Sequence, residues 1–514
     1  MPRPPASAGP GRTRDDLSVL RPDLLARYDA ELAGARASIL GRLLGAVDRE
    51  PLPGLTERHA GAATFAIAGA GPVTVRYPVE AAQPFAIARA GLAAEAGERR
   101  SIVDPAELVR LLWGDVALAG EVDNSVANLA LARADRPADQ LPEAGDPDAL
   151  GRIEQLVTDG HPLHPCCRTR GGMTVADVLA YAPEHSPVLR LRRLRVPPDR
   201  WYGTAPPTLY AHPWQADRLA GRYPWLTADG ESDPVRPLMS LRTVAPVNGG
   251  PHLKTAVDVR MTSAVRTVSP AAVHNGPVLS RLLRRLLADQ PIDLLAEIAA
   301  GAVVVDGVPQ RHLAHVVREA PQLGAGELAV PLAAFGASPA LQARVQDPYA
   351  WLARLSEVFF APITRVLARG VALEAHGQNT LVVLRDDRPA RMLYRDLGGV
   401  RVSPARLRAA GLEPPALHGD LPSDDPAELR AKLSAAAFGT VAAELIATFA
   451  RTRNADPDRM WGIVARAVRA TGTEDAPHLL RDPLPVKATT AMRLAADPLD
   501  DRWALLPNPM AAHA

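Results

Sequence analysis

The sequence predicts an α+β fold, with mainly helical ends around a β-rich middle. Two patterns carry this prediction. Between residues 186 and 275, apolar and polar residues alternate in short runs that Pro and Gly interrupt, which is typical of strands. On either side of this region, apolar residues recur at helical spacing. The helices expected from that spacing cover 24–49, 106–120, 277–300, 347–370, 426–453 and 457–471.

The N-terminal part holds a small β element between its first two expected helices. Short strands are expected at 62–68 and 73–77, around a Gly-Ala-Gly-Pro turn. Residues 135–149 are polar and rich in Pro, Asp and Gly, so we expect a linker or an exposed loop there. This stretch sets the first expected domain boundary, after residue 150.

The β-rich middle contains an expected hairpin centred on Val-Asn-Gly-Gly at 247–250, because Asn-Gly is a strong hairpin signal. A two-residue loop would place Thr243 opposite Lys254, whereas the flanking Pro246 and Pro251 allow a wider loop. In both cases hydroxyl groups, an arginine and a lysine come close together, and such a set suits phosphate or carboxylate oxygens. The alternative is the solvated face of an exposed hairpin.

A second expected hairpin brings together polar residues that are distant in the sequence. Its strands cover 380–384 and 392–396, so segment 374–379 lies at the same end of the ribbon as Asp396. Burying so many polar groups costs free energy unless they satisfy one another or bind a ligand. Glu374 and Asp396 are candidate ligands for Mg²⁺, which prefers carboxylate and phosphate oxygens. A mutually satisfied structural cluster is the alternative.

The composition limits the class of protein. Apolar residues make up 47% of the 514 residues and charged residues 22%, as in soluble globular proteins. The net charge of +1 provides no global field to recruit nucleic acid or an anionic membrane. The N-terminus has no apolar core typical of a signal peptide, and no uncharged apolar run reaches the length of a membrane span. We therefore expect a cytoplasmic protein without nucleic-acid or membrane partners.

Lysine is scarce in this chain. Of the 58 lysine and arginine residues, only Lys254, Lys432 and Lys487 are lysines. Heavy use of Arg, Ala and Pro indicates a GC-rich coding bias, under which general surface cations are arginines. A retained lysine then marks a place where a compact ammonium group is needed, although chance retention is the alternative for any single one.

The segment Gly160–Pro165 is followed by Cys166, Cys167, Arg168 and Arg170. Its histidines and cysteines suggest zinc, but its prolines prevent a helix that would align the histidines, and adjacent cysteines rarely bind one metal ion. We expect instead a rigid polar loop that presents His and Arg to an anion, with a purely structural loop as the alternative. The adjacent cysteines also exclude a disulfide framework.

Several segments, in this order, together resemble the siderophore synthetases of the IucA/IucC family, the aerobactin-synthetase type that works without a non-ribosomal peptide synthetase. The segments are GHPLHP with Arg168 and Arg170, HPWQ at 212–215, SLRT with HLK and MTSAVR, EAHGQN with YRD, and VKATTAMR. The resemblance covers about 150–510. It implies adenylation of a carboxylate of citrate or a related acid by ATP, with release of pyrophosphate. The acyl group then passes to an amine or alcohol.

The resemblance also implies a cupped-hand architecture, often dimeric. We assign residues 1–150 to a helical thumb, 151–345 to antiparallel β-rich fingers and 346–514 to a largely helical palm. The positions implied to bind ATP are His164, Ser240, Arg242, Thr243, Lys254, Arg266, His376, Gln378, Asn379 and Asp396. Those implied to face the acid are Arg266, His376 and Lys487. The implied catalytic residues are His376, Arg242, Arg266 and Lys254.

One position departs from the pattern of the family. Arg168 stands where the family usually has a lysine, which is either a tolerated exchange or the mark of a subgroup with another acid or nucleophile. Lys432 lies outside every motif, and we expect it at the surface.

The expected chemistry needs charge neutralisation and in-line geometry rather than a covalent nucleophile. Arg242, Lys254, Arg266 and Mg²⁺ would neutralise the two anions that react. One alternative is a kinase-like phosphotransferase, although no standard Gly-rich phosphate loop occurs. Another is a protein that binds or reduces ferric siderophores, although two adjacent cysteines cannot supply a four-thiolate cluster.

Overall fold

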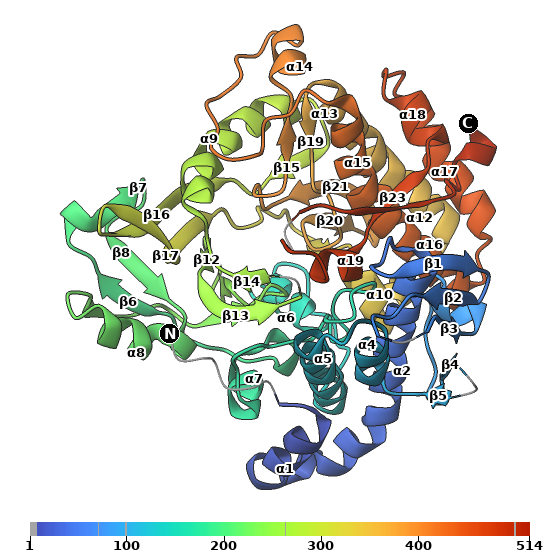
Figure 1. Ribbon diagram of the computed structural model, residues 1–514. Coiled ribbons are helices and arrows are strands. Elements are labelled where there is room, and N and C mark those ends of the chain that lie inside the picture. The colour runs from blue at the N-terminus through green and yellow to red at the C-terminus, as the bar shows by residue number, and fades with distance from the viewer. Residues whose placement is uncertain (1–7, 70, 98–99, 263, 498–499) are drawn as a thin grey trace.

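The computed structural model describes residues 8–69, 71–97, 100–262, 264–497 and 500–514. Helices and mainly antiparallel sheets alternate along it, which confirms the α+β prediction. In Figure 1 the N-terminal helices lie at the bottom, a group of strands at the left and the C-terminal helices at the right. Segments from all three parts meet in the middle of the view.

The N-terminal part packs two long helices beside a small sheet. Its helices are α1 (Pro10–Leu20), η1 (Pro22–Leu24), α2 (Leu25–Arg49), α3 (Val79–Ala82), α4 (Pro105–Trp113) and α5 (Val116–Ala134). Its strands, paired in sequence order, are β1 (Leu55–His59), β2 (Ala62–Phe65), β3 (Val73–Arg76), β4 (Ala94–Ala96) and β5 (Arg100–Ile102).

The helix predicted over 24–49 is confirmed, but the single helix predicted over 106–120 is wrong. Gly114, in the left-handed conformation at φ 62°, ends α4. The Asp115 side chain then accepts a hydrogen bond from Leu118 N and begins α5. Gly114 and Asp115 therefore divide the predicted helix in two, although the helical spacing of apolar residues continues across them.

The middle of the chain carries most of the sheet structure. The six-stranded sheet has the order β10 (Val235–Pro237), β11 (Thr243–Pro246), β12 (His252–Thr255), β17 (Val308–Arg318), β16 (Glu297–Val305) and β7 (Trp201–Gly203). Smaller sheets join β8 (Thr208–Ala211), β6 (Arg192–Arg195) and β9 (Thr227–Glu231), and pair β13 (Val257–Met261) with β14 (Ala264–Arg266). The helices here are α6 (Ala149–Gln155), α7 (Val175–Tyr181), η2 (Pro183–His185), η3 (Pro198–Arg200), α8 (Pro213–Arg222) and α9 (Pro270–Leu287).

The helix predicted over 277–300 is wrong in its second half. Helix α9 ends at Leu287, and residues 297–305 form strand β16, which lies between β17 and the edge strand β7 in the six-stranded sheet. The Ala-rich segment favours a helix locally, but Gly301 packs against the Trp201 ring so closely that a Cβ would lie 1.9 Å from it. Sheet pairing therefore overrides local propensity here.

The C-terminal part is mainly helical. Its helices are α10 (Ala334–Ala337), α11 (Pro339–Arg344), α12 (Pro348–Leu355), α13 (Ala361–Ala368), α14 (Pro404–Ala409), α15 (Pro426–Ala436), α16 (Ala443–Arg453), α17 (Pro457–Arg469), α18 (Ala476–Arg481), α19 (Thr489–Arg493) and η6 (Ala511–His513). One four-stranded sheet has the order β15 (Ile292–Leu294), β21 (Arg388–Tyr394), β20 (Thr380–Arg385) and β18 (Glu327–Pro331). Two strand pairs are β19 (Val371–Ala372) with β22 (Arg401–Val402), and β23 (Leu484–Lys487) with β24 (Trp503–Leu506).

The predicted helices 347–370 and 426–453 are confirmed, each with one π-helical turn in its middle. These turns are η4 (Ser356–Phe360) and η5 (Ala437–Ala442). Within the second, Gly439 lies so close to β23 that an added Cβ would be 2.8 Å from the Pro485 carbonyl oxygen. The widened turn and the missing side chain let the strand that carries Lys487 pack directly on the helix.

Two large apolar cores support this arrangement. One lies around α2 and α5 and includes Cys166, Val257 and Ala488 from other parts of the chain. The other surrounds α12 to α17 and includes Ile153 and Leu283. Because each core takes residues from distant segments, the parts of the chain are joined by packing rather than by flexible linkers.

Among the described residues, one helix, Pro426–Arg453, is long and apolar enough to cross a membrane. Of its most apolar stretch, 72% is buried inside the protein, as in the core helix of a globular fold.

Candidate active site

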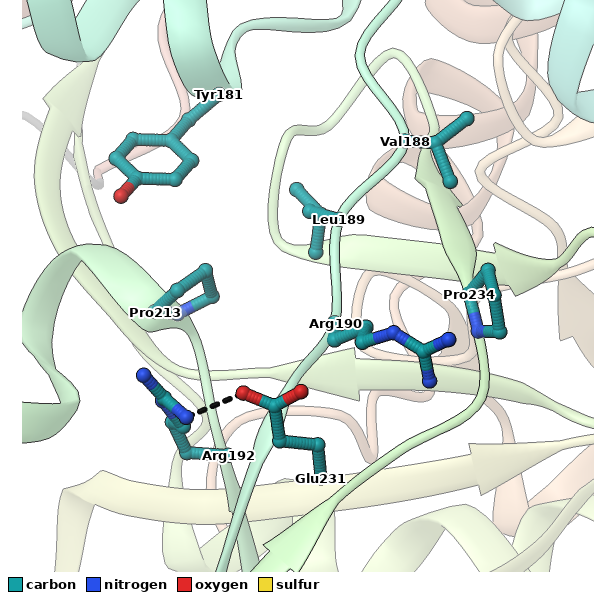
Figure 2. Close-up of a pocket in the computed structure, with 8 residues that line it drawn as sticks. All are labelled: Tyr181, Val188, Leu189, Arg190, Arg192, Pro213, Glu231 and Pro234. Carbon is teal, nitrogen blue, oxygen red and sulfur yellow. Dashed lines mark hydrogen bonds and ion pairs between the residues drawn. The ribbon is translucent and has the colours of Figure 1, made fainter.

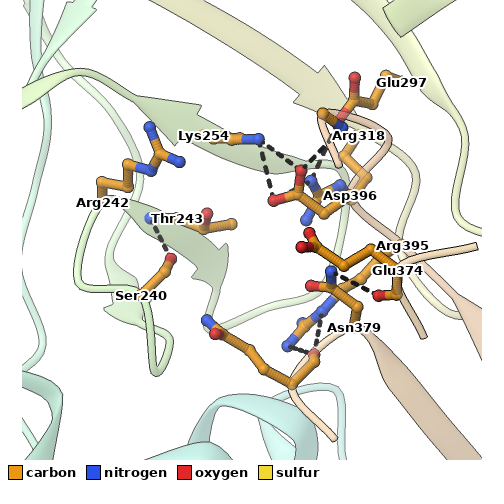
Figure 3. Close-up of polar contacts among 12 residues, drawn as sticks. Ser240, Arg242, Thr243, Lys254, Glu297, Arg318, Glu374, Asn379, Arg395 and Asp396 are labelled. Atoms are coloured by element: carbon orange, nitrogen blue, oxygen red, sulfur yellow. Dashed lines mark hydrogen bonds and ion pairs between the residues drawn. The ribbon is translucent and has the colours of Figure 1, made fainter. Parts of the chain in front are cut away.

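The two predicted hairpins converge on one place. In the first, Thr243 pairs with Lys254, as predicted for the narrow register. In the second, Thr380 pairs with Tyr394, and Arg395 N donates a hydrogen bond of 3.0 Å to Asn379 O. The ends of these ribbons therefore face each other, with Lys254 pointing toward Asp396 (Figure 3).

Lys254 and Asp396 form the centre of this site. Lys254 Nζ donates to both carboxylate oxygens of Asp396, at 2.8 and 2.9 Å. Arg318 Nη2 lies 3.5 Å from Asp396 and 3.1 Å from Glu297 (Figure 3). Burial alone would raise the pKa of Asp396, but the charges of Lys254 and Arg318 hold it well below its usual range. Asp396 is thus ionised, and two buried cations meet at it.

Two further arginines add positive charge beside this pair. Arg242 donates through Nη1 to the Thr267 carbonyl, and Arg266 Nη2 donates to Thr262 Oγ1 at 2.8 Å. The Nε atoms of both arginines are buried without a hydrogen-bond partner among the described residues. Burial, together with the charges of Arg242 and Arg170, lowers the pKa of Arg266 to about 9. Clustered buried cations with unused donors suit an anionic ligand.

The backbone is strained where these side chains are positioned. Leu241, Thr262 and Asp396 have φ angles of 66°, 52° and 72°, in the left-handed region that non-glycine residues seldom adopt. Each is adjacent to, or part of, the cationic cluster: Leu241 lies between Ser240 and Arg242, and Thr262 contacts Arg266. Such strain is concentrated at functional sites, where the surrounding structure maintains it.

The loop from Glu374 to Asn379 is held by its own polar groups. Gln378 N donates to His376 Nδ1 at 3.3 Å, and Asn379 Nδ2 donates to Glu374 O at 3.2 Å. Burial is the largest influence on the pKa of His376 and lowers it, so the imidazole is neutral at neutral pH. Arg395 joins this ribbon to helix α6, because its Nη1 forms a 2.7 Å ion pair with the fully buried Glu154.

A second ionic cluster lies beside this loop and contains the other two lysines. Glu374 Oε1 is 3.1 Å from Lys487 Nζ and 3.3 Å from Lys432 Nζ. Asp501 completes the group, at 3.3 Å from Lys487 and 3.0 Å from Lys432. Burial alone would raise the pKa of Glu374, but Lys487 and Lys432 lower it to about 2. We call these four residues the lysine–carboxylate quartet.

The expectation that Lys432 is a surface residue is wrong. Its side chain is only 6% exposed and lies in the quartet, because α15 packs against β23 and turns this side chain toward Glu374. All three lysines of the chain therefore lie at the ionic clusters around segment 374–396. Lysine scarcity was a better guide to the site than motif membership.

Lys487 is positioned by contacts with the N-terminal part of the chain. The buried carboxylate of Glu50 accepts hydrogen bonds from Thr490 N at 2.9 Å and Ala491 N at 2.8 Å, at the start of α19. Arg493, in the same helix, makes two 2.8 Å hydrogen bonds to Glu121. The VKATTAMR segment is thus joined to α2 and α5, which fixes the strand that carries Lys487.

The GHPLHP loop divides into two parts with different roles. His161 lies near the site. Burial lowers its pKa to about 3, and the charges of His376, Lys487 and Arg266 add to this effect. His164 Nδ1 accepts from Cys166 N at 2.9 Å, so one face of this ring stabilises the turn. Both rings are in edge-to-face contact, 6.3 Å between centroids.

The expectation that this loop also presents Arg168 to an anionic ligand is wrong. Arg168 Nε donates to Thr158 O at 2.6 Å, Nη2 donates to Val157 O, and Nη1 lies 3.2 Å from Glu184. Arg170 Nη2 lies 2.6 Å from the other oxygen of Glu184. Both guanidinium groups are buried, and Arg168 connects two loops of the protein.

We expect Arg168→Lys to lower the free energy of unfolding by about 1–3 kcal/mol, because one ammonium group cannot reach two carbonyls and a carboxylate in different directions. Chemical denaturation would measure this change. Arg195→Lys, at a 72% exposed side chain that pairs with Asp229, is the control and should be nearly neutral. An Arg168→Lys variant of unchanged stability but altered substrate preference would contradict the structural role.

The carboxylates of the site are too few for an all-protein metal cage. In the described ranges, no group of three or more His, Cys, Asp or Glu side chains is arranged to hold a metal ion. Mg²⁺ commonly takes only one or two carboxylates together with phosphate oxygens, a donor set that Glu374 and Asp396 fit. Each of the two already neutralises lysine, so a metal ion would share them with Lys487 or Lys254.

An open pocket of about 390 Å³ lies elsewhere, on the β-rich part of the chain (Figure 2). Its charged residues Arg192 and Glu231 pair with each other, and in Figure 2 Tyr181 and Pro213 lie on one side of it and Val188 and Pro234 on the other. None of the predicted site residues lines it, so it is separate from the candidate site.

Four residues of the site escaped the sequence analysis: Glu154, Glu297, Arg318 and Asp501. Glu297 and Arg318 stand in apolar strands, where a charged residue at an inward-facing position was a usable signal. Asp501 lies just before strand β24, among other polar residues, and offered no such signal. Only the folded chain brings it within 3.0 Å of Lys432.

Comparison with known families divides the chain into two matched regions. Residues 149–210 and 206–337 match the IucA / IucC family. Residues 349–513 match the family described as ferric iron reductase FhuF-like transporter. Together these regions include every candidate residue described above.

Individual proteins are also similar to this chain. Staphyloferrin A synthase of Staphylococcus aureus is 28% identical over 68% of this chain and 70% of its own length. The D-ornithine–citrate ligase of the same organism is 22% identical over 51% of each chain. The ATP-bound structure of aerobactin synthetase IucA from Klebsiella pneumoniae superposes with a TM-score of 0.72, at 18% identity over 93% of this chain and 99% of that one. This last likeness concerns the fold.

Proposed function

We propose that this chain, which belongs to the IucA/IucC family, is an ATP-dependent acid–amine ligase of siderophore biosynthesis. It would activate a carboxylate of citrate or a related acid as the acyl-adenylate and transfer the acyl group to an amine or alcohol. The observation that carries this proposal is the proximity of two ionic clusters with two cations each: Lys254 with Arg318 at Asp396, and Lys487 with Lys432 at Glu374. Two polyanionic substrates need two such clusters.

The first cluster suits the nucleotide. Lys254 and Arg242 supply charge for phosphate oxygens, and Ser240 and Thr243 supply hydroxyl groups on the same ribbon. The set that we propose for ATP is completed by His164, Arg266, His376, Gln378, Asn379 and Asp396. The ATP-bound relative of this fold supports the choice of nucleotide.

The second cluster suits the acid. We propose that Arg266, His376 and Lys487 face its carboxylates. Lys487 is 36% exposed and can be reached by a ligand, whereas Lys432 behind it is 6% exposed. The printed activity of a relative, a D-ornithine–citrate ligase, supports citrate as the class of acid.

The reaction needs positioning and charge neutralisation rather than a nucleophile of the protein. A carboxylate oxygen attacks the α-phosphorus, the bond to the bridging oxygen breaks, and pyrophosphate leaves. Lys254, Arg242 and Arg266 neutralise the charge that the two anions bring together. In the second step the acceptor nitrogen attacks the acyl carbon, AMP leaves, and the nitrogen loses a proton. His376, neutral at neutral pH, can donate or accept a hydrogen bond at the reacting oxygen.

Mg²⁺ would supply further neutralisation of the phosphate oxygens when bound. Glu374 and Asp396 are the carboxylates that we propose to hold it. We also propose that the enzyme is a cytoplasmic homodimer, built from a thumb (1–150), fingers (151–345) and a palm (346–514). The ATP requirement supports the cytoplasmic location. Strands β15 and β18 of the second part complete the four-stranded sheet of the third, so fingers and palm would move as one body.

The proposed reaction type can be tested with hydroxylamine as a surrogate acceptor. With Mg-ATP and citrate or another polycarboxylic acid, we expect AMP, pyrophosphate and a hydroxamate in equal amounts. Phosphate-specific assays and mass spectrometry would measure the three products. ADP and phosphate, with no AMP for any acid, would instead identify a kinase-like phosphotransferase. Iron-dependent visible absorbance without nucleotide turnover would identify a ferric-siderophore protein.

A further inference from the structure

Glu154 is a buried carboxylate that takes no part in the reaction proposed above. It lies near the C-terminal end of helix α6, and its side chain is 0% exposed. In Figure 1 this helix lies near the middle of the view, between the strands at the left and the helices at the right. Burial of a charged group costs free energy that specific partners must offset.

Each oxygen of Glu154 contacts a different ribbon of the candidate site. The first ribbon is the pair of strands β11 and β12, and the second is the pair β20 and β21. Glu154 Oε2 accepts a hydrogen bond of 3.0 Å from Met239 N, in the turn that carries Ser240 and leads into the first ribbon. Glu154 Oε1 lies 2.7 Å from Arg395 Nη1, and Arg395 connects the second ribbon to Asp396. One carboxylate therefore joins the two ribbons.

Arg395 extends this connection to the loop that follows Glu374. Its Nε and Nη2 donate to the Gln378 carbonyl oxygen at 3.1 and 2.8 Å, and its backbone N donates to Asn379 O at 3.0 Å. Figure 3 shows Arg395 together with Asn379 and Asp396 at this end of the second ribbon. Both ribbons and the loop thus share one anchor, the ion pair of Glu154 with Arg395.

Helix α6 is itself held against both ribbons. Arg236 of β10, which pairs with β11, donates through Nε to both oxygens of Asp148 at 2.7 Å. Its Nη1 also donates to Gln155 Oε1 at 3.2 Å. Leu150 of the same helix packs in an apolar cluster with residues of β20 and β21. Because α6 packs on both ribbons, Glu154 has a fixed position between them.

We propose that Glu154 is a positioning residue of the nucleotide site, which sets the distance between Ser240 of the first ribbon and Asp396 of the second. The inference rests on the proposed ATP-dependent function, and Glu154 acts through Met239 and Arg395 rather than on a substrate. The direct contact from the first ribbon to Asp396 is exchanged for phosphate oxygens in the proposed reaction. A link that takes no part in the reaction is therefore needed to hold the ribbons when ATP is bound.

Glu154→Gln tests this role, because the amide keeps the shape of the side chain and removes its charge. We expect kcat/KM for ATP to fall about 10- to 100-fold, since small displacements of positioned groups have effects of this size. The Kd for ATP, titrated without acid, should rise as well. The KM for the acid should change less than the KM for ATP.

Glu327 provides a matched control near the turn of the second ribbon, at the end away from the site. Its side chain is 1% exposed, and its Oε2 accepts a hydrogen bond of 2.8 Å from Gly324 N. Its Oε1 lies 2.6 Å from Arg385 Nη2 and from Arg391 Nη1. Glu327→Gln removes the same kinds of contact, so it should lower the denaturation midpoint while the Kd and KM for ATP stay at the parental values.

The double variant Glu154→Leu/Arg395→Met removes the anchor without leaving an unpaired charge. Replacing a buried ion pair by apolar side chains of similar size is often neutral or stabilising. Met239 and Gln378 are partly exposed, so water can reach the backbone groups that lose a partner. Thermal unfolding should therefore show a folded protein, whereas the Kd for ATP should rise as in Glu154→Gln.

A folded variant of either kind with parental Kd and kcat/KM for ATP would overturn the inference. Loss of folding in both variants, or the same effect on ATP in Glu327→Gln, would overturn it as well. The Kd comparison is independent of the reaction type. If the wild-type enzyme forms ADP instead of AMP, the proposed ligase reaction fails and the Kd values still test the anchor. If it forms AMP and the hydroxamate while the variants bind ATP normally, the ligase activity stands and the positioning role fails.

Discussion

Replacing Lys254 with alanine is expected to lower kcat/KM for ATP by about 10²- to 10³-fold, whichever acid is supplied. Lys254 is 5% exposed, and its ammonium group contacts both oxygens of Asp396 at 2.8 and 2.9 Å. In the proposed reaction the Lys254 ammonium group turns from Asp396 to phosphate oxygens of ATP, where negative charge builds up. A compact cation preorganised in a buried site is worth more than the same cation in water, since no solvent must reorganise.

The protein should remain folded without Lys254, because Arg318 stays 3.5 Å from Asp396 and continues to neutralise it. Lys254→Arg should restore only part of the activity, since a planar guanidinium needs more room and different directions than an ammonium group. Arg195→Ala, at an exposed ion pair, is the control for loss of a cation and should match the parent. Steady-state kinetics would measure kcat/KM for ATP in each variant, and thermal unfolding would show whether the variant is folded. A Lys254→Ala variant with parental kcat/KM would remove Lys254 from the nucleotide site.

Local sequence signals predicted the parts of the site that two hairpins bring together. Asn-Gly at 248–249 and the alternation around it led to the Thr243–Lys254 pair, which the structure confirms. The hairpin expected from strands at 380–384 and 392–396 placed Asn379 near Asp396 in the same way, although the second strand is found at 388–394. A hairpin register follows from a short segment, because the side-chain period and the turn together leave few alternatives.

Contacts between distant segments could not be predicted in this way. Asp501 and Lys432 meet at 3.0 Å across 69 residues, through the packing of β23 on α15. Arg318 reaches Asp396 from a strand in another sheet. Nothing in the local pattern around Asp501 or Arg318 indicates the partner, since long-range packing and not local propensity decides it.

The two cysteines show how the same residues can suggest a site and serve the core. Cys166 and Cys167 lie in a motif segment, yet both are buried in the apolar core around α2. Burial is the main reason that the pKa of the Cys166 thiol is raised far above its usual range. Such a thiol is neither a nucleophile nor a ready metal ligand at neutral pH.

The lysine–carboxylate quartet gives the second large expected effect. In the double variant Lys432→Ala/Lys487→Ala, Glu374 loses both cations that contact it, and Asp501 keeps only Arg401, at 4.0 Å. We expect kcat/KM for a polycarboxylic acid to fall about 10²- to 10³-fold, as for loss of a preorganised charge. The unpaired Glu374 carboxylate, only 18% exposed, should also lower the free energy of unfolding by about 3–5 kcal/mol, the usual cost of breaking a buried pair.

The single variants should separate two roles. Lys487 is 36% exposed, so Lys487→Ala should raise KM for the acid, most for acids with several carboxylates, where one carboxylate is recognised without reacting. The Lys432 side chain is 6% exposed and contacts the same Glu374 oxygen from the protein interior. Compared with Lys487→Ala, Lys432→Ala should therefore lower the free energy of unfolding more and change the KM for the acid less. Because a guanidinium fork does not fit this buried position, Lys432→Arg should also be destabilised.

Denaturation midpoints and KM values for mono-, di- and tricarboxylic acids would measure both effects. If Lys432→Arg and Lys487→Arg both match the parent in stability and in KM, the site has no need of lysine, and the scarcity of lysine in this chain carries no functional information.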